Sequence, residues 1–271
     1  MNTAQLHASV RDELLDRLRF VALQPQTVLD LGVGAGTSAH ELRRRYPKAL
    51  VIAADVAPAR ARPARLSRAR RPACFIRRLQ HVRIEARRLP FPDASVDLVF
   101  SNLMLASCGD LDPVLAQIHR VLRPGGLFTF STLGPDTLRE LREAWAEADR
   151  HGHVGSFLDL HEVGDALGRS GFAEPVLDVD RHTLRYGDPM TLLRDLKASG
   201  SRNLSPDRSR GLTGRGTLAR MTRAYERHRR EGQLPATTEV VYATAWGTES
   251  RLARVVSGEA VVPLSRLRRP G

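Results

Sequence analysis

Three glycines at alternating positions are spaced as in a loop whose backbone binds a ligand. Gly32, Gly34 and Gly36 follow the apolar run at residues 28–31, and a helical pattern comes directly after them. Glycine permits the sharp turn and the close approach of backbone to ligand, and a helix start offers free N–H groups. Asp55 ends a second apolar run 19 residues after Gly36, where a parallel strand delivers a carboxylate to a ribose diol. These residues predict a nucleotide-type site.

Asp30 and the glycine spacing narrow the ligand. The motif is G-x-G-x-G, not the G-x-G-x-x-G of dinucleotide sites, and Asp30 lies inside it. A carboxylate there repels a diphosphate but can hold the amino-acid end of S-adenosylmethionine. The sequence therefore favours a methyl-donor site, and the alternative is a strand, turn and helix that bind no ligand.

The elements that must position these residues follow an α/β pattern. A Pro-Gly-Gly sequence at 124–126 predicts the turn into the fifth strand. A further helix is expected near His161. The sequence predicts strands at 27–31, 50–54, 82–85, 96–101 and 126–131, and helices at 12–21, 36–45 and 111–122.

The C-terminal half predicts a hairpin interrupted by helices. Residues 176–186 and 237–246 are rich in β-branched and aromatic residues, which favour strands. Residues 188–235 carry helical patterns broken by glycine and proline, which predicts an inserted helical cap. We expect one domain over residues 1–271, with Trp145 and Trp246 in its core.

Composition sets the broad class. The chain has 271 residues, of which 42% are hydrophobic, enough for a sizeable core. It has neither an apolar stretch of membrane-spanning length nor the pattern of a signal peptide, so we expect a cytoplasmic protein without membrane association. Cys74 and Cys108 lack metal-ligand spacing, which predicts reduced thiols and no metal site.

The net charge of +12 leaves three interpretations open. Only Lys48 and Lys197 of the 42 basic residues are lysines, so arginine usage partly reflects a compositional bias. Residues 60–88 are the densest basic stretch and contain a single aromatic residue, Phe75, so stacking on nucleic acid is disfavoured. A solvated basic face and an acidic protein partner are the stronger alternatives to RNA.

Longer motifs resemble a known family. Residues 30–36, Asp55 and the segments 89–99 and 122–126 resemble class I S-adenosylmethionine-dependent methyltransferases. That resemblance implies a Rossmann-like α/β fold with a seven-stranded, mostly parallel sheet. Over about residues 10–270, the chain also resembles BioC-like malonyl-acyl-carrier-protein O-methyltransferases of biotin synthesis, most specifically at 130–142, 157–167 and 234–237.

The resemblance implies a cofactor, a substrate and a partner. A malonyl carboxylate is already ionised at neutral pH, so no catalytic base is expected, only alignment and desolvation. The partner is malonyl-acyl-carrier protein, which is acidic, and the enzyme is expected to be a monomer. The residues implied to bind S-adenosylmethionine are Asp30, Gly32, Gly34, Gly36, Asp55, Glu85, Ala86, Asn102 and Leu103.

The substrate-binding residues are predicted from charge. A buried carboxylate needs a strong donor beside it. For each arginine or lysine candidate, and for Glu85 at the expected end of the third strand, a solvated surface charge is the alternative, whereas for His161 it is a helix-start or packed histidine. The candidates for the substrate are Arg139, Arg142, His161, Arg185 and Lys197, and those for steering the acidic partner are Arg68, Arg70, Arg71, Arg77 and Arg78.

Two departures from the family pattern keep other functions open. The family carries a Tyr-Asp pair before the first helix, whereas this chain has no tyrosine before Tyr46, which predicts an altered lid. The family's Gln-Trp before cysteine is replaced by Ala106 and Ser107. The alternatives are a methyltransferase with a reshaped pocket, a decayed enzyme, and a non-methylating assembly factor or relative of an arginine hydroxylase.

Overall fold

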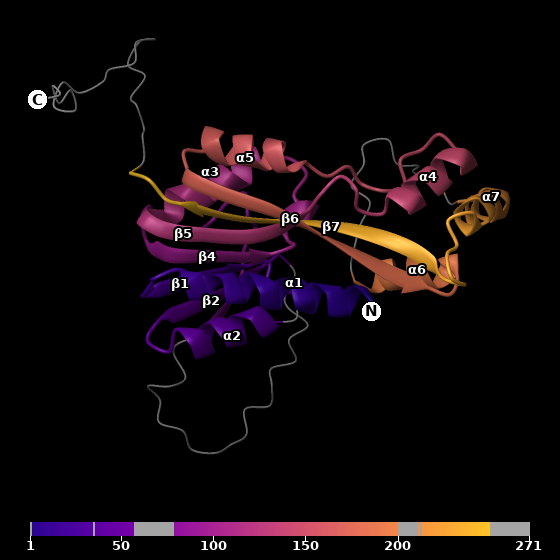
Figure 1. Ribbon diagram of the computed structural model, residues 1–271. Helices are drawn as coiled ribbons and strands as arrows, with labels where there is room; N and C mark the ends of the chain where they lie inside the picture. The colour runs from indigo at the N-terminus through magenta and orange to yellow at the C-terminus, as the bar shows by residue number, and fades with distance from the viewer. Residues whose placement is uncertain (1, 35, 57–78, 200–210, 212, 250–271) are drawn as a thin grey trace, which may run out of the picture.

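Among the described residues, the sheet has seven strands in the order β3-β2-β1-β4-β5-β7-β6, and β7 alone runs opposite to the other six (Figure 1). The computed structural model describes residues 2–34, 36–56, 79–199, 211 and 213–249. The strands are β1 (Thr27–Leu31), β2 (Leu50–Asp55), β3 (Leu79–Arg83), β4 (Val96–Asn102), β5 (Leu122–Leu133), β6 (Ala173–Tyr186) and β7 (Leu234–Trp246). The expected seven-stranded, mostly parallel α/β sheet is confirmed.

Helices cover both faces of this sheet. In Figure 1, α1 and α2 lie along one face, α3 and α5 along the other, and α4, α6 and α7 gather at one end. That end is where β5 finishes and β7 begins. The helices are α1 (Thr3–Arg17), α2 (Thr37–Arg45), α3 (Asp112–Val121), α4 (Arg139–Ala148), α5 (Leu160–Arg169), α6 (Pro189–Ala198) and α7 (Arg215–Glu226), with short 3₁₀ turns at Leu18–Phe20 and Leu105–Ser107.

The core consists of two apolar clusters, one on each face of the sheet. The central parallel strands are buried on both faces, so their sequences are nearly continuous apolar runs, as in residues 51–54 of β2. Helix α3 buries Val114, Leu115 and Ile118, whose helical spacing places them on one face. Trp145 lies in the core as expected, and Trp246 packs partly buried against it.

The bounds of the first helix and of the third strand differ from the predictions, and one helix was not predicted. The first helix begins at Thr3, not near residue 12, because Asn2 and Gln5 form a reciprocal capping box. Strand β3 spans Leu79–Arg83, not 82–85, because its register pairs Leu79 with Val51 of β2. Glu85 therefore lies beyond the end of the strand. Helix α4 follows β5 where no helix was predicted.

The Pro-Gly-Gly sequence is part of a strand, so the predicted turn is wrong. Val96 pairs with Leu122 and Leu98 pairs with Leu127, so β5 has extra residues at this point and its register with β4 shifts. Gly125 supplies a φ of +74°, and its N–H donates to the carbonyl of Gly247 at 2.8 Å. Glycine thus makes an irregularity within the strand in place of a chain reversal.

Candidate active site

Three polar residues finish three neighbouring parallel strands. Asp30 lies near the end of β1, Asp55 ends β2 and Asn102 ends β4. Because β2, β1 and β4 are adjacent and parallel, their carboxyl ends meet at one edge of the sheet. The structure therefore gathers residues that stand more than 70 positions apart in the sequence at one site.

The glycine turn is anchored to β2. The Gly32 and Val33 N–H groups donate to the Ala54 carbonyl at 2.8 and 3.2 Å, and the Gly34 N–H donates to Oδ2 of Asp55 at 2.9 Å. The Asp55 carboxylate is thus held at the turn by a backbone donor. We infer that it also sets the shape of the loop that a ligand meets.

The three glycines of the turn are required for different reasons. Gly32, Gly34 and Gly36 have φ values of +81°, +51° and +84°, a region that favours glycine. A Cβ on Gly32 would lie 2.3 Å from the Met104 side chain, whereas a Cβ on Gly34 or Gly36 would have no atom within 4 Å. Gly32 is therefore required by packing inside the protein, and Gly34 and Gly36 border open space that a ligand can enter.

Asp30 is a buried carboxyl group beside this open space. Its residue is 1% exposed, and its Oδ2 accepts a hydrogen bond from Ser38 Oγ at 2.6 Å. Burial raises the pKa of Asp30 to about 7, the Ser38 hydrogen bond opposes this shift, and the Asp55 charge adds to it. A cation brought next to Asp30 favours the ionised form. The Asp30 carboxylate therefore fits the ammonium end of a zwitterionic ligand.

Asn102 and Leu103 are held between β5 and the first helix. Ser131 Oγ donates to Asn102 Oδ1 at 2.9 Å, and Asn102 Nδ2 donates to the His7 carbonyl at 3.1 Å. Leu103 has a φ of +57°, and its N–H donates to both oxygens of Ser131 at 3.0 Å. Helix α1 therefore reaches the strand ends, a contact that was not predicted from the sequence.

The start of α1 is fastened to the C-terminal part of the fold. Oδ2 of Asp195 on α6 accepts hydrogen bonds from the Thr3 N–H at 2.8 Å, Thr3 Oγ1 at 2.8 Å and the Tyr186 hydroxyl at 2.6 Å. Burial pushes the pKa of Asp195 up, but the hydrogen bonds from Tyr186 and Thr3 leave it below its usual value. Asp195 is therefore an ionised acceptor that joins α1, β6 and α6.

Glu85 and Ala86 lie on the outer flank of the same edge, after β3. Glu85 is exposed and Ala86 is buried, and the Arg88 N–H donates to the Glu85 carbonyl at 2.9 Å. Val56, directly after Asp55, is 57% exposed. An exposed apolar residue beside an acidic one suits a ligand with a flat ring and a polar sugar. Val56 was not among the residues predicted from the sequence.

The five candidate substrate residues are not gathered in one place. Arg139 and Arg142 share α4, His161 is exposed on α5, and Arg185 pairs with Glu231 at 3.1 Å. Lys197 is exposed on α6. The structure brings only Arg139 and Arg142 close together.

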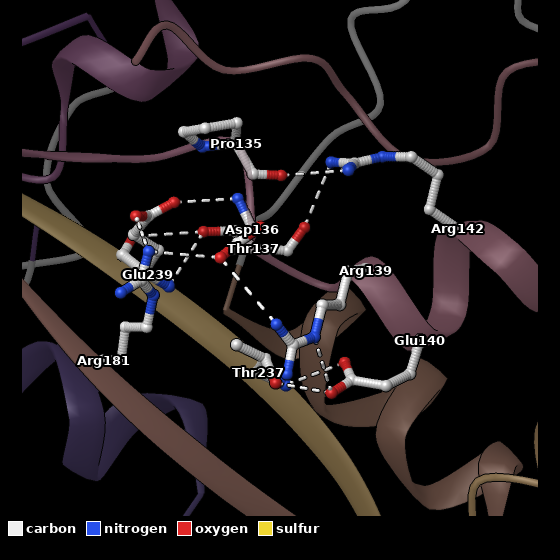
Figure 2. Close-up of polar contacts among 9 residues, drawn as sticks. All are labelled: Pro135, Asp136, Thr137, Arg139, Glu140, Arg142, Arg181, Thr237 and Glu239. Carbon is white, nitrogen blue, oxygen red and sulfur yellow. Dashed lines mark hydrogen bonds and ion pairs between the residues drawn. The ribbon is translucent and has the colours of Figure 1, made fainter. Parts of the chain in front are cut away.

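Both arginines of α4 already have partners (Figure 2). Arg139 lies 3.8 Å from Asp136 and 3.6 Å from Glu140, atom to atom. Arg142 donates to the carbonyls of Pro135 at 2.9 Å and Thr137 at 3.1 Å, so it clamps the turn that leads from β5 to α4.

Two buried glutamates beside these arginines were missed. Glu140 is 6% exposed and accepts hydrogen bonds from the Thr237 N–H at 3.0 Å and from Thr237 Oγ1 (Figure 2). Glu239 is 5% exposed and accepts from the Asp136 N–H at 2.8 Å and from Arg181 at 3.0 Å. We call this set, with Gly134 and Thr137, the β5–β7 junction.

The junction unites two of the motifs that carried the family resemblance. A Cβ on Gly134 would lie 2.7 Å from Glu239, and the Leu138 N–H donates to the Thr237 carbonyl at 2.7 Å. The segments 130–142 and 234–237 therefore contact each other in the fold. The resemblance of segment 130–142 was the available signal for Glu140, but without the fold it assigned that residue no role, and Glu239 lies outside both segments.

Other sequence expectations concern metals, membranes and thiols. Within the described ranges, no three His, Cys, Asp or Glu side chains are grouped to hold a metal ion, and no helix is long and apolar enough to cross a membrane. Burial raises the pKa of the Cys108 thiol. Cys74, Arg68, Arg70, Arg71, Arg77 and Arg78 lie outside the described residues.

Comparisons with known proteins show which proteins this chain is similar to. A family model described as a methyltransferase domain matches residues 29–130, from β1 through most of β5. A malonyl-acyl-carrier-protein O-methyltransferase of Halorhodospira halophila is 47% identical over 246 residues, which are 90% of this chain and 82% of that protein. The protein of the same name from Methylovorus sp. is 45% identical over 92% of this chain and 85% of its own length.

A solved structure supports the fold independently. The YcgJ protein of Bacillus subtilis superposes with a TM-score of 0.60 at 14% identity, over 88% of this chain and 99% of that one. At this identity the likeness concerns the fold alone. It agrees with the Rossmann-like, seven-stranded arrangement.

Proposed function

This chain belongs to the malonyl-acyl-carrier-protein O-methyltransferase family, and we propose that it methylates the free carboxylate of a malonyl group carried by an acyl-carrier protein. The identity of 45–47% over at least nine-tenths of the chain carries this conclusion. The methyl donor is S-adenosylmethionine. Of the functions considered from sequence, the relatives favour the enzyme over a non-methylating assembly factor.

The residues at the strand ends fit the donor. Asp30 offers a buried carboxylate for an ammonium group, and Asp55 offers one for a ribose diol next to the open face of Gly34. Asn102 and Leu103 approach the methionine part, and Glu85, Ala86 and Val56 flank the adenine side. When bound, S-adenosylmethionine supplies a methyl group on a positively charged sulfur.

The reaction asks little of catalytic side chains. The malonyl carboxylate is ionised near neutral pH, so no residue has to remove a proton. One carboxylate oxygen forms the new bond to the methyl carbon, and the bond between that carbon and sulfur breaks with its electron pair left on sulfur. The protein contributes alignment and exclusion of water. Methylation removes the negative charge of the acyl end, which agrees with a role in making a biotin precursor.

The test is methyl transfer to defined acceptors. The purified protein, with radiolabelled donor and malonyl-carrier protein, is expected to form a base-labile methyl ester that has one negative charge less. Acetyl-carrier protein, free malonate and RNA serve as the other acceptors. Equal labelling of acetyl-carrier protein, or labelling of RNA alone, contradicts the proposed reaction.

Ala106 and Ser107 replace the family's Gln-Trp before Cys108, so the acceptor that is methylated shows whether the pocket is reshaped. Leu105 in this segment is buried, and Met104 contacts Gly32, so the segment packs against the glycine turn. If the protein binds S-adenosylmethionine but methylates a different small acid in place of malonyl-carrier protein, the reshaped-pocket alternative is correct.

A further inference from the structure

An apolar groove that two arginines help to line lies on α6 and α7. Its apolar part is formed by side chains such as Leu218 and Met190, and Met190 is 42% exposed. Arg215, Ala219 and Arg223 are spaced by four residues, so they share one face of α7. The groove is lined by Met190, Arg215, Leu218, Ala219, Thr222 and Arg223.

The arginines of the groove differ from those nearby. Arg227 pairs with Glu147, and Arg229 pairs with Glu226 at 2.7 Å. Arg215 and Arg223 are exposed, and neither forms an ion pair with any carboxylate in the part of the chain that the structure describes. With respect to the described residues, the groove therefore presents two positive charges without an ion-pair partner beside apolar surface.

The groove lies at the same end of the molecule as the strand ends. Helix α7 packs against α4, which follows β5, and it precedes β7 (Figure 1). Helix α6 is joined to the start of α1 through Asp195 and Thr3. The same α1 contacts Asn102 at the end of β4. A substrate tethered to a protein that is docked here therefore lies at the end of the sheet where the donor site is.

We propose that this groove docks an acidic amphipathic helix of the acyl-carrier protein, an inference that rests on the proposed function. Arg215 and Arg223 pair with carboxylates of that helix, and Leu218 and Met190 receive its apolar side chains. Charge complementarity selects this occupant, because acyl-carrier proteins are acidic and none of the described residues that line the groove carries a carboxylate. The steering surface predicted at residues 60–88 stays a separate prediction, since most of that stretch lies outside the described residues.

The experiment compares a tethered substrate with a small one. The variant Arg215→Glu/Arg223→Glu is assayed with malonyl-carrier protein and with malonyl-pantetheine, which has no carrier. The control is Arg43→Glu/Lys48→Glu, the same charge change at exposed sites at and just after the C-terminal end of α2. Far-UV circular dichroism and thermal melting establish that each variant is folded.

The groove variant is expected to lose about tenfold or more in kcat/KM for malonyl-carrier protein, because attraction is replaced by repulsion during encounter. Its kcat/KM for malonyl-pantetheine and its affinity for the donor stay at the wild-type values. The control variant stays within about twofold of wild type, since it alters only the general charge.

Three results overturn the proposal, and one result refutes the function beneath it. Equal losses in both variants mean that only net charge matters. Equal losses on both substrates mean that the groove supports the active site and not the carrier. A concentration-dependent dimer that disappears in the groove variant, with unchanged kinetics, assigns the face to a second copy. If the wild-type protein does not methylate malonyl-carrier protein, the proposed function itself is wrong.

Discussion

At the scale of single residues, the proposed role of Asp30 in the donor site predicts a link between protonation and donor binding. Burial raises its pKa to about 7, well above the usual value of a carboxyl group, so the folded protein holds this proton more tightly than the unfolded chain does. The contribution of Asp30 to the free energy of unfolding is fully present below about pH 4 and is lost as the pH rises through about 7. A bound cation reverses this preference.

Donor affinity is therefore expected to rise with pH. Between about pH 6 and about pH 8 the ionised fraction of a group with a pKa of about 7 increases about tenfold, and the association constant should follow it. Asp30→Asn should bind more weakly and without this pH dependence. Its unfolding free energy relative to wild type should increase from about pH 4 to about pH 7. Calorimetric titrations and urea melts measure both, and an equal pH dependence in the variant contradicts the assignment.

Asp55 has two separable roles, as a charge and as an acceptor for the turn. Asp55→Ala removes both the carboxylate and the hydrogen bond from the Gly34 N–H, whereas Asp55→Asn keeps an acceptor there. We expect the alanine variant to lose about 1–3 kcal/mol of donor binding, and the asparagine variant to lose less. Isothermal titration of folded variants tests this, and wild-type affinity in both means that Asp55 does not bind the ribose.

At the scale of elements, the β5–β7 junction contains family-like segments, and its hydrogen bonds are expected to stabilise the fold. Thr237 donates two hydrogen bonds to the buried Glu140, from its N–H and its hydroxyl. Thr237→Val keeps the shape but leaves one carboxylate oxygen without the hydroxyl donor. The expected cost is about 1–3 kcal/mol of unfolding free energy, and Thr237→Ser should recover most of it. Equal stability of the valine variant and wild type in chemical denaturation shows that the hydroxyl contributes nothing.

The elements also show where local patterns mislead. The Pro-Gly-Gly sequence has the composition of a turn, yet β5 continues through it because β4 and the segment after β7 pair with either side. Strand β3 begins earlier than predicted because its limits follow its register with β2. Neighbouring strands supply hydrogen-bond partners that a local window does not contain.

At the scale of the whole molecule, the net charge of +12 favours encounters with acidic proteins. Raising the salt concentration from about 50 to about 300 mM shortens the Debye length from about 14 to about 6 Å. The KM for malonyl-carrier protein should therefore increase, while the KM for malonyl-pantetheine and donor affinity change little. Steady-state kinetics in a neutral salt measure this, and identical responses of both substrates show that the charge does not act on the carrier.

The sequence by itself determined the α/β class, the glycine turn and the positions of Asp30, Asp55 and Asn102 near the ends of strands. These features depend on short patterns, because the alternation of apolar strands with helices encodes a parallel sheet whose carboxyl ends must coincide. The donor-site prediction needed only the additional carboxylate inside the motif.

Tertiary structure decided which distant groups meet. The contact of α1 with Asn102, the pairing of Glu140 with Thr237, and the assignment of Gly32 to packing against Met104 all join segments far apart in the chain. The sequence likewise did not separate Arg142, which clamps backbone carbonyls, from Arg215 and Arg223, which border an apolar groove. The physical reason is that residue type specifies what a side chain can bind, and only the packed fold specifies which partners are within reach.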